Sequence, residues 1–192
     1  MKKVVLIASI LFVAVASTAC INNLAVQDLN NKAKSYADKG DYAQAIERLK
    51  SSIDLDPSIF ETHYNLAVVY TQSGDYVNAV EEYKKVISMK PKMADSYYSL
   101  ATAQNNLAVD MEQGKVRIDE GGSLFTPVEP LDEGLKLSSN EEKYIVELYG
   151  SSLENYKKYL GLAPNASDKD DVEAQIVKIN NKLNPERESN KG

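Results

Sequence analysis

A 34-residue repeat is the feature of this sequence that most constrains its fold. Six residues recur at one offset, and a repeat of this length indicates stacked supersecondary units, none of which buries its apolar face alone. The chain is therefore expected to be a scaffold that works through a partner. The recurring residues are Tyr36, Gly40, Asp41, Tyr42, Ala45 and Pro57, which return as Tyr70, Gly74, Asp75, Tyr76, Ala79 and Pro91.

Each unit is predicted to contain two helices joined by a tight turn. In the second unit, apolar residues recur with helical spacing on both sides of Gly74 and Asp75. Glycine suits the left-handed position that closes the first helix, and aspartate suits the N-cap of the second. Pro57 fits the first position of the helix that follows, where a missing N–H group costs nothing.

The spacing resembles the consensus of the tetratricopeptide repeat (TPR) family. The resemblance implies an all-α fold, a short solenoid of antiparallel helix pairs. The first repeat, counted from Val26, departs from the consensus at Lys32 and Ser52. The second repeat, counted from Phe60, supplies His63, Leu66, Ala67, Tyr70, Gly74, Tyr76, Ala79, Tyr83, Val86 and Pro91 at consensus positions.

A third repeat begins on time at Ala94 but is split by an insertion. Its second helix is predicted around Tyr149, Ser152 and Tyr156, and Pro164 follows Pro91 by 73 residues instead of 34, which leaves 39 inserted residues. The first helix is expected to continue to about Gln113 and to stop at Gly114. Both helices of this repeat are therefore predicted to be longer than those of the other repeats.

The insertion itself spans residues 114–139. Gly121 and Gly122 lie between short runs that favour strands, which indicates a small β-hairpin. Ser139 with Glu142 three residues later resembles a capping box at the start of the next helix. A loop of this length is usually functional or mobile, and the sequence leaves both open.

The N-terminus resembles a bacterial lipoprotein signal. Two lysines precede an apolar run over residues 4–16, and small residues lead to Cys20, the single cysteine. Ser17 stands where the lipobox usually has leucine. The alternatives are ordinary secretion with a free thiol, or an uncleaved anchor, for which 13 apolar residues fall short of the ~20 that span a bilayer.

We therefore expect a lipidated (palmitate-carrying) Cys20 and an extracytoplasmic protein attached to the membrane through its lipid. Ile21 resembles the outer-membrane class of lipoproteins, on the periplasmic face of a Gram-negative envelope. Cleavage before Cys20 removes two lysines and leaves 20 basic against 28 acidic residues, a net charge of −8. Such an acidic domain is not expected to bind nucleic acid.

The repeats, the insertion and the signal together predict a domain organisation. The C-terminal part includes a helix beginning at Ser167 whose apolar face covers the last repeat. The predicted segments are a signal peptide 1–19, a tether 20–25, TPR 1 at 26–59, TPR 2 at 60–93, TPR 3 at 94–164 with the inserted loop 114–139, a capping helix 165–184 and a disordered tail 185–192.

Catalytic and metal-binding patterns are nearly absent. His63 is the sole histidine, and it occupies a repeat position that the family fills with a packing residue. With Cys20 assigned to lipidation, no nucleophile–histidine pair is left, and clustered metal ligands are missing. We predict neither an enzyme nor a cofactor.

In TPR proteins the first helix of each repeat lines a concave groove that holds a peptide or helix. The resemblance places sixteen residues of this chain on that surface: Asn30, Asn31, Lys34, Asp38, Glu61, Tyr64, Asn65, Val68, Thr71, Gln72, Asp95, Tyr98, Ser99, Thr102, Asn105 and Asn106. The predicted partner-binding residues are Asn30, Lys34, Glu61, Tyr64, Asn65, Val68, Asp95, Tyr98, Thr102 and Asn105.

The predicted function is that of an adaptor that binds an envelope protein or peptide. A clamp for chaperone tails, known from some TPR domains, needs basic residues in the third repeat, where this chain has Asp95 and Ser99. The resemblance therefore does not imply that ligand. The alternative is a structural lipoprotein that self-associates as a homo-oligomer through the long hairpin of the third repeat.

Overall fold

The computed structural model describes residues 23–128 and 136–184, which fold into seven helices and one two-stranded sheet. The all-α fold class is confirmed. Cys20 and the tail from residue 185 lie outside the described residues, so the lipidation site and the disordered tail stay predictions. The chain divides between Ser73 and Gly74 into two compact units.

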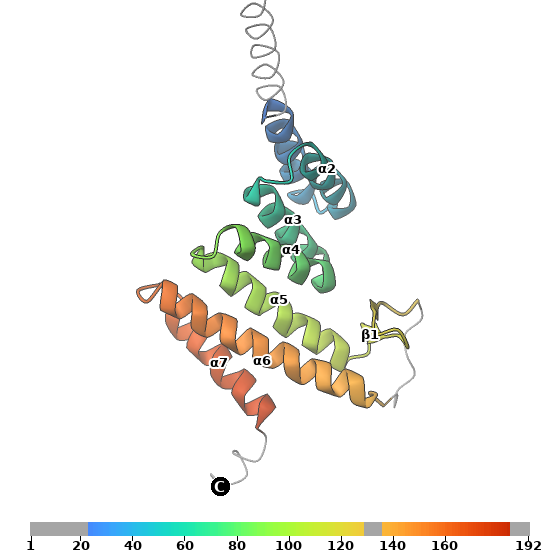
Figure 1. Cartoon of the computed structure of the whole chain (residues 1–192), viewed down its shortest axis with the longest axis vertical. Helices are drawn as coiled ribbons and strands as arrows, with labels where there is room; N and C mark the ends of the chain where they lie inside the picture. Colours follow the sequence, from blue (N-terminus) through green and yellow to red (C-terminus); the bar gives the residue numbers. More distant parts are fainter. Residues whose placement is uncertain (1–22, 129–135, 185–192) are drawn as a thin grey trace, which may run out of the picture. The chain divides into compact units, whose positions relative to one another are not determined.

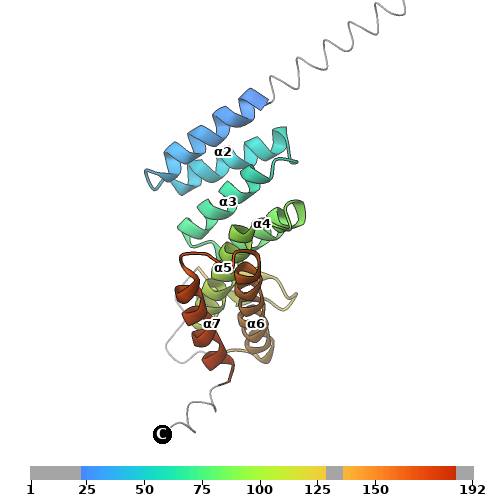
Figure 2. The same ribbon diagram turned by 90° about the vertical axis from the view of Figure 1, so that its left-hand side faces the viewer.

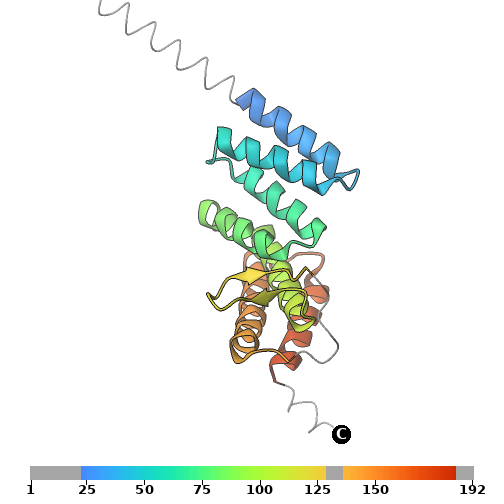
Figure 3. The same ribbon diagram turned by 90° about the vertical axis from the view of Figure 1, so that its right-hand side faces the viewer.

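The first unit consists of three helices that lie side by side (Figure 3): residues 23–37, α2 (Tyr42–Leu55) and α3 (Phe60–Ser73). The turn before α2 has the predicted chemistry. Gly40 takes a φ of 77°, and the Asp41 carboxylate accepts a hydrogen bond of 3.2 Å from the backbone N–H of Gln44. Small and branched side chains fill the core between the helices: Ala33, Ala45, Leu49, Leu66 and Ala67 are buried.

The first helix begins earlier than the sequence predicted. Residues 23–25, assigned to the tether, are helical. The side-chain amide of Gln27 donates to Asn23 Oδ1 at 3.1 Å, a contact across one helical turn that favours helix at this end. The helix therefore includes three of the residues that were predicted to form the tether.

The second unit contains α4 (Tyr76–Met89), α5 (Ala94–Glu112), α6 (Ser139–Leu162) and α7 (Lys169–Leu183). Consecutive helices pack on one another, α4 on α5, α5 on α6 and α6 on α7 (Figures 1 and 2). The helices α2 and α4 begin 34 residues apart, as do α3 and α5. The 34-residue repeat of the sequence is thus also the spacing at which equivalent helices begin.

The split third repeat has the predicted register. Its helices are longer than α4, since α5 has 19 residues and α6 has 24 against 14. The hydroxyl of Ser152 donates to the carbonyl of Ala101 at 2.7 Å, and Asn155 donates to the Gln104 side chain at 2.8 Å. The C-terminal half of α6 is therefore the second helix of the repeat.

The insertion begins with a short hairpin. Gly114 ends the preceding helix with a φ of 71°, as predicted. Strand β1 (Arg117–Ile118) then pairs antiparallel with β2 (Leu124–Phe125). Gly122 supplies the left-handed turn with a φ of 84°. Figure 3 shows the hairpin beside α5 and α6.

A buried ion pair ties this hairpin to the start of α6. The Arg117 guanidinium donates to both carboxylate oxygens of Glu141, and its Nη2 lies 2.9 Å from Oε2. The backbone N–H of Ile118 donates to the same carboxylate at 3.2 Å. The Glu141 side chain is 1% exposed. These donors, Arg117 foremost, lower the pKa of Glu141 to about 2 although burial opposes them.

The capping box of α6 lies one residue before its predicted position. Ser138 and Glu141 form it, not Ser139 and Glu142: the Ser138 hydroxyl accepts from the Glu141 backbone, and the Glu141 carboxylate accepts from the Ser138 backbone. Both pairs have the required spacing. Arg117 favours the observed register, because its guanidinium donates to the carboxylate of Glu141.

The C-terminal helix α7 covers α6, as predicted for a cap. Val172 and Ile179 are buried, while the Lys182 ammonium lies 2.6 Å from both Glu112 Oε2 and the Tyr149 hydroxyl. The helix begins at Lys169 rather than Ser167. Within the part of the chain that the structure describes, no helix has the length and apolar character needed to span a membrane.

Candidate functional site

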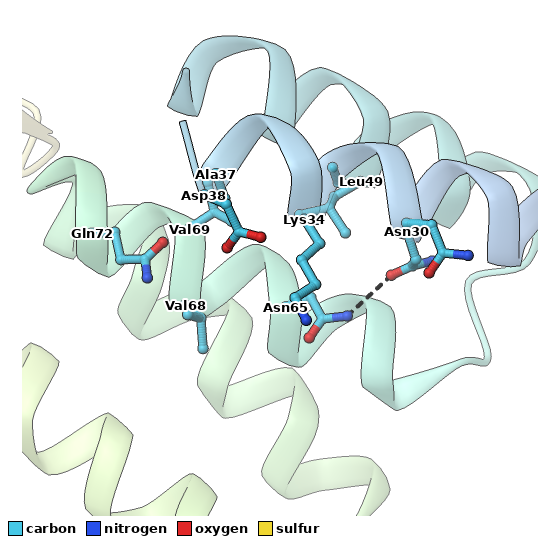
Figure 4. A pocket seen from close by; sticks show the side chains of 11 residues that line it. Asn30, Lys34, Ala37, Asp38, Leu49, Asn65, Val68, Val69 and Gln72 are labelled. Atoms are coloured by element: carbon cyan, nitrogen blue, oxygen red, sulfur yellow. Dashed lines mark hydrogen bonds between the residues drawn. The ribbon is translucent and has the colours of Figure 1, made fainter. Parts of the chain in front are cut away.

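A pocket of about 320 Å³ lies in the first unit (Figure 4). Its walls come from the helix over residues 23–37 and from α3, and Leu49 of α2 completes it. Seven of the eleven lining residues belong to the surface predicted for the groove. The lining residues are Asn30, Asn31, Ala33, Lys34, Ala37, Asp38, Leu49, Asn65, Val68, Val69 and Gln72.

Asn30 is turned toward the protein and holds a polar network beneath the pocket. Its amide Nδ2 lies 2.8 Å from Ser52 Oγ, 3.1 Å from Thr62 Oγ1 and 2.9 Å from the carbonyl of Val26. Ser52 and Thr62 are fully buried. The amide hydrogens of Asn30 therefore form hydrogen bonds within the protein, which stabilise the fold, and they are not available to a ligand.

The same network orients Asn65. Its Nδ2 donates to Asn30 Oδ1 at 3.1 Å, the contact drawn in Figure 4. Because the donors of Asn30 point inward, only its oxygen is left for Asn65, and this fixes which way round both amides lie. The exposed Asn65 thus presents a carbonyl oxygen and one N–H that no other described residue occupies.

Charged and apolar groups complete the pocket. Figure 4 shows Lys34, Asp38 and Gln72 around it, with Val68 on the α3 side. Lys34 and Asp38 are exposed. The pocket therefore combines one ammonium, one carboxylate, several amides and an apolar wall. Such a lining suits a polypeptide segment, which offers backbone donors and acceptors together with side chains.

A second pocket of about 440 Å³ shares Asn30, Asn31 and Asn65 with the first and contains Glu61. The two pockets therefore adjoin at these three residues, and together they are called the groove of the first unit below. Its further lining residues are Asn23, Val26, Gln27, Ile59 and Thr62. Of the predicted partner-binding residues in this unit, only Tyr64 lines neither pocket; it is half-buried on α3.

The sequence did not single out Asn23 and Gln27, which lie before and beside the counted start of the first repeat. It also placed Asn30 on the groove without foreseeing its inward network. The signal for that network was present: Ser52 departs from the family pattern at a buried position. A hydroxyl in a core needs a partner, and Asn30 is the partner.

The predicted residues of the second unit lie elsewhere, along α5. The Thr102 hydroxyl lies 3.0 Å from the Tyr156 hydroxyl, and Asn105 is 3.5 Å from its neighbour Asn106. Tyr98 contacts the rings of Tyr156 and Tyr159. Asp95 is exposed in the first turn of α5. The sequence placed Tyr156 in the second helix of the third repeat, but the contacts of Tyr156 and Tyr159 with Tyr98 were not foreseen.

His63 has the structural setting that its repeat position predicted. It is 5% exposed, and its Nε2 lies 3.1 Å from the backbone carbonyl of Pro57. Over residues 23–128 and 136–184, no three His, Cys, Asp or Glu side chains gather closely enough to hold a metal ion.

Comparison with known proteins identifies the repeats. Residues 33–74 and 69–107 match the family model of the TPR repeat. No curated protein matched the chain. Among solved structures, the chain is similar to the first TPR of Spaghetti (RPAP3) bound to the HSP90 peptide SRMEEVD, with 16% identity and a TM-score of 0.58 over 83% of this chain and 94% of that one.

Two further solved structures have the same fold. The TPR2B domain of yeast Sti1 in complex with pHsp70 is 15% identical, with a TM-score of 0.57 over 83% of this chain and 98% of that one. The Sgt2 TPR domain from Aspergillus fumigatus is 17% identical, with a TM-score of 0.56 over 87% and 82% of the two chains. At these identities the similarity establishes the all-α TPR repeat fold.

Proposed function

Because residues 33–107 match the family model of the TPR repeat, we propose that this chain is a peptide-binding adaptor, anchored by a lipid on Cys20, that docks a protein of the bacterial cell envelope. The observation that carries the proposal is the groove of the first unit. Seven groove positions predicted from the repeat line one pocket there, and the Asn65 amide is held in a fixed orientation.

The chemistry of the groove favours an extended segment over a helix. A helix satisfies its own backbone groups internally, whereas an extended strand carries free N–H and C=O groups. Amide side chains recur along the groove, with Asn31, Asn65 and Gln72 exposed among them. An oriented amide accepts an N–H and donates to a C=O of the same peptide.

The ligands of the similar structures do not transfer directly. Spaghetti and Sti1 are solved with an HSP90 peptide and with pHsp70. In this chain the third repeat carries Asp95 and Ser99 where the chaperone clamp needs basic residues. We therefore propose a ligand other than an acidic chaperone tail.

The test is site-specific photo-crosslinking of the full-length chain in its own cells. A benzophenone side chain is placed at Val68, in the groove, and at Val177, which is 57% exposed on α7 and serves as the control. The proposal expects Val68 to capture one partner through a defined segment, identified by mass spectrometry, and Val177 not to capture it.

A second variant makes the test specific to the groove. Asn65→Ala removes the oriented amide but leaves the buried contacts of Asn30 with Ser52 and Thr62 intact. Capture from Val68 is expected to fall several-fold in this variant. Equal capture from Val68 and Val177, or capture insensitive to Asn65→Ala, would place the binding site outside the groove.

A further inference from the structure

Three tyrosine rings form a cluster in the second unit. The ring centre of Tyr98 on α5 lies 5.8 Å from that of Tyr156, edge to face, and 5.3 Å from that of Tyr159, tilted. Tyr156 and Tyr159 are buried, whereas 38% of Tyr98 remains exposed. Two buried rings therefore support one ring that meets solvent.

Hydrogen bonds hold the two supporting rings in place. The Tyr156 hydroxyl pairs with the Thr102 hydroxyl at 3.0 Å. The Tyr159 hydroxyl donates to Asp168 Oδ1 at 2.6 Å, just before α7 begins. The cluster thus joins α5, α6 and the start of α7, and Tyr98 rests on a rigid base.

The charges around the cluster are negative. Asp95 precedes Tyr98 by three residues on α5, so both lie on one side of that helix. The pKa of Tyr159 is raised to about 12, first by its hydrogen bond to Asp168, then by burial and by the negative charges of Asp168 and Asp95. The field at the rings is therefore that of two carboxylates.

We propose that Tyr98, Asp95 and Asp168 form a subsite for an arginine side chain of the partner peptide. The face of a tyrosine ring attracts a cation, and the planar guanidinium stacks on it. The Asp95 carboxylate, exposed three residues before Tyr98 on α5, supplies the ion-pair partner. An acidic side chain is repelled here, and an uncharged one gains only the contact with the ring.

This subsite rests on the proposed function, because it would bind one side chain of the partner that the adaptor docks. It is nevertheless a separate structure, built wholly from the second unit. The acidic net charge, −6 for the whole sequence and −8 after cleavage before Cys20, favours association with a basic partner over longer distances. Net charge does not distinguish one basic side chain from another, whereas the subsite selects arginine at one position.

The experiment measures binding of two matched small probes to the full-length chain in a neutral detergent. Nα-acetyl-arginine amide carries the cation, and Nα-acetyl-citrulline amide has the same shape without the charge. Ring proton signals of the tyrosines, assigned with Tyr98→Leu, report binding by NMR. The arginine probe is expected to shift the Tyr98 signals and to bind roughly three- to fivefold more tightly than the citrulline probe.

Two variants locate the effect. Asp95→Asn is expected to reduce the preference for arginine to about twofold or less while the Tyr98 signals keep their positions in the free protein. Asp54→Asn, an exposed carboxylate on α2, is the control and leaves the preference unchanged. Equal binding of both probes, or a preference that survives Asp95→Asn, overturns the subsite.

The outcomes also separate this subsite from the proposed function. If Val68 captures a partner but the arginine probe shows no preference, the adaptor stands and the subsite falls. If the probe binds at Tyr98 but Val68 captures nothing, the subsite stands as a site for basic peptides, and the groove of the first unit is not the docking surface.

Discussion

Asn30 supports the groove without offering its own donors to a ligand. Its amide joins the buried hydroxyls of Ser52 and Thr62 on one side and the exposed Asn65 on the other. The residue therefore links the stability of the first unit to the orientation of a ligand-facing amide. A substitution here should affect both properties, which distinguishes Asn30 from its neighbour Asn31.

Asn30→Ala is expected to lower the free energy of unfolding by about 1–3 kcal/mol, because two buried hydroxyls lose a partner. Asn31→Ala, an exposed residue of the same pocket, is the matched control and should change it by less than about 0.5 kcal/mol. Urea denaturation followed by circular dichroism measures both. Equal stability of the two variants would contradict the network.

Glu141 gives the stability of the second unit a defined pH dependence. Its pKa is about 2 in the folded chain against an ordinary 4.5. The stabilisation is therefore complete above about pH 4.5 and is lost as the pH falls toward 2. Over this range the carboxylate contributes on the order of 3 kcal/mol, since each unit of pKa corresponds to about 1.4 kcal/mol.

Glu141→Gln is accordingly expected to be less stable than the wild type by about 3 kcal/mol at pH 7. The difference should shrink by about 2 kcal/mol at pH 3. Urea unfolding at the two pH values checks this, with Glu142→Gln, the exposed next residue, as a control that shows neither effect. A difference that stays constant with pH would rule out the ionised Glu141 as its source.

At the scale of the helices, α7 contributes by covering apolar surface. Val172 and Ile179 are 1% exposed, while Val177 on the same helix is 57% exposed. Its last turn is held as well, because Lys182 reaches Glu112 of α5 and Tyr149 of α6. A repeat domain needs such an end element, since the last repeat otherwise leaves its apolar side in water.

Ile179→Ala should therefore destabilise the chain by about 2–4 kcal/mol and lower the melting temperature by several degrees. Val177→Ala removes apolar atoms from the same helix at an exposed position and should leave the melt within about 1 °C. Thermal unfolding followed by circular dichroism compares them. Similar shifts for both variants would contradict the packing assigned to α7.

The repeat pattern predicted the helix boundaries correctly where residues that are neighbours in sequence determine the turn and the cap. Gly40 with Asp41 and Gly74 with Asp75 mark turns whose caps form as expected. The prediction failed by one residue at the start of α6, where Ser138 and Ser139 are each followed by glutamate three residues later. The contact of Glu141 with Arg117, which is distant in sequence, favours the pair Ser138 and Glu141. Local residue spacing does not reveal such a contact.

For the candidate site, too, the sequence predicted some features and missed others. Repeat positions predicted seven of the eleven residues that line the pocket, because a repeat fixes which side of a helix each position faces. They did not reveal that Asn30 bonds inward or that Tyr98 rests on Tyr156 and Tyr159. Those details depend on side chains from other helices, which enter only with the packed structure.

At the scale of the whole molecule, attachment to the membrane is proposed to depend on one atom, the sulfur of Cys20. The wild type is expected to be labelled by radioactive palmitate and to fractionate with membranes. Cys20→Ala should lose the label, whereas Ser17→Leu, which restores the usual lipobox residue, should keep it. Labelling of Cys20→Ala, or its absence from the wild type, would refute the lipid anchor.

The ion pair between Arg117 and Glu141 affects how well this chain tolerates an insertion. Glu141 accepts from the backbone N–H of both Ile118 and Ser138, so the two ends of the excursion over residues 119–137 are held together at one carboxylate. Once the ends are fixed, lengthening the segment between them costs little, since doubling the length of a loop costs only about 0.6 kcal/mol. A tag or reporter domain inserted between these two ends is therefore expected to leave the helices α5 and α6 folded.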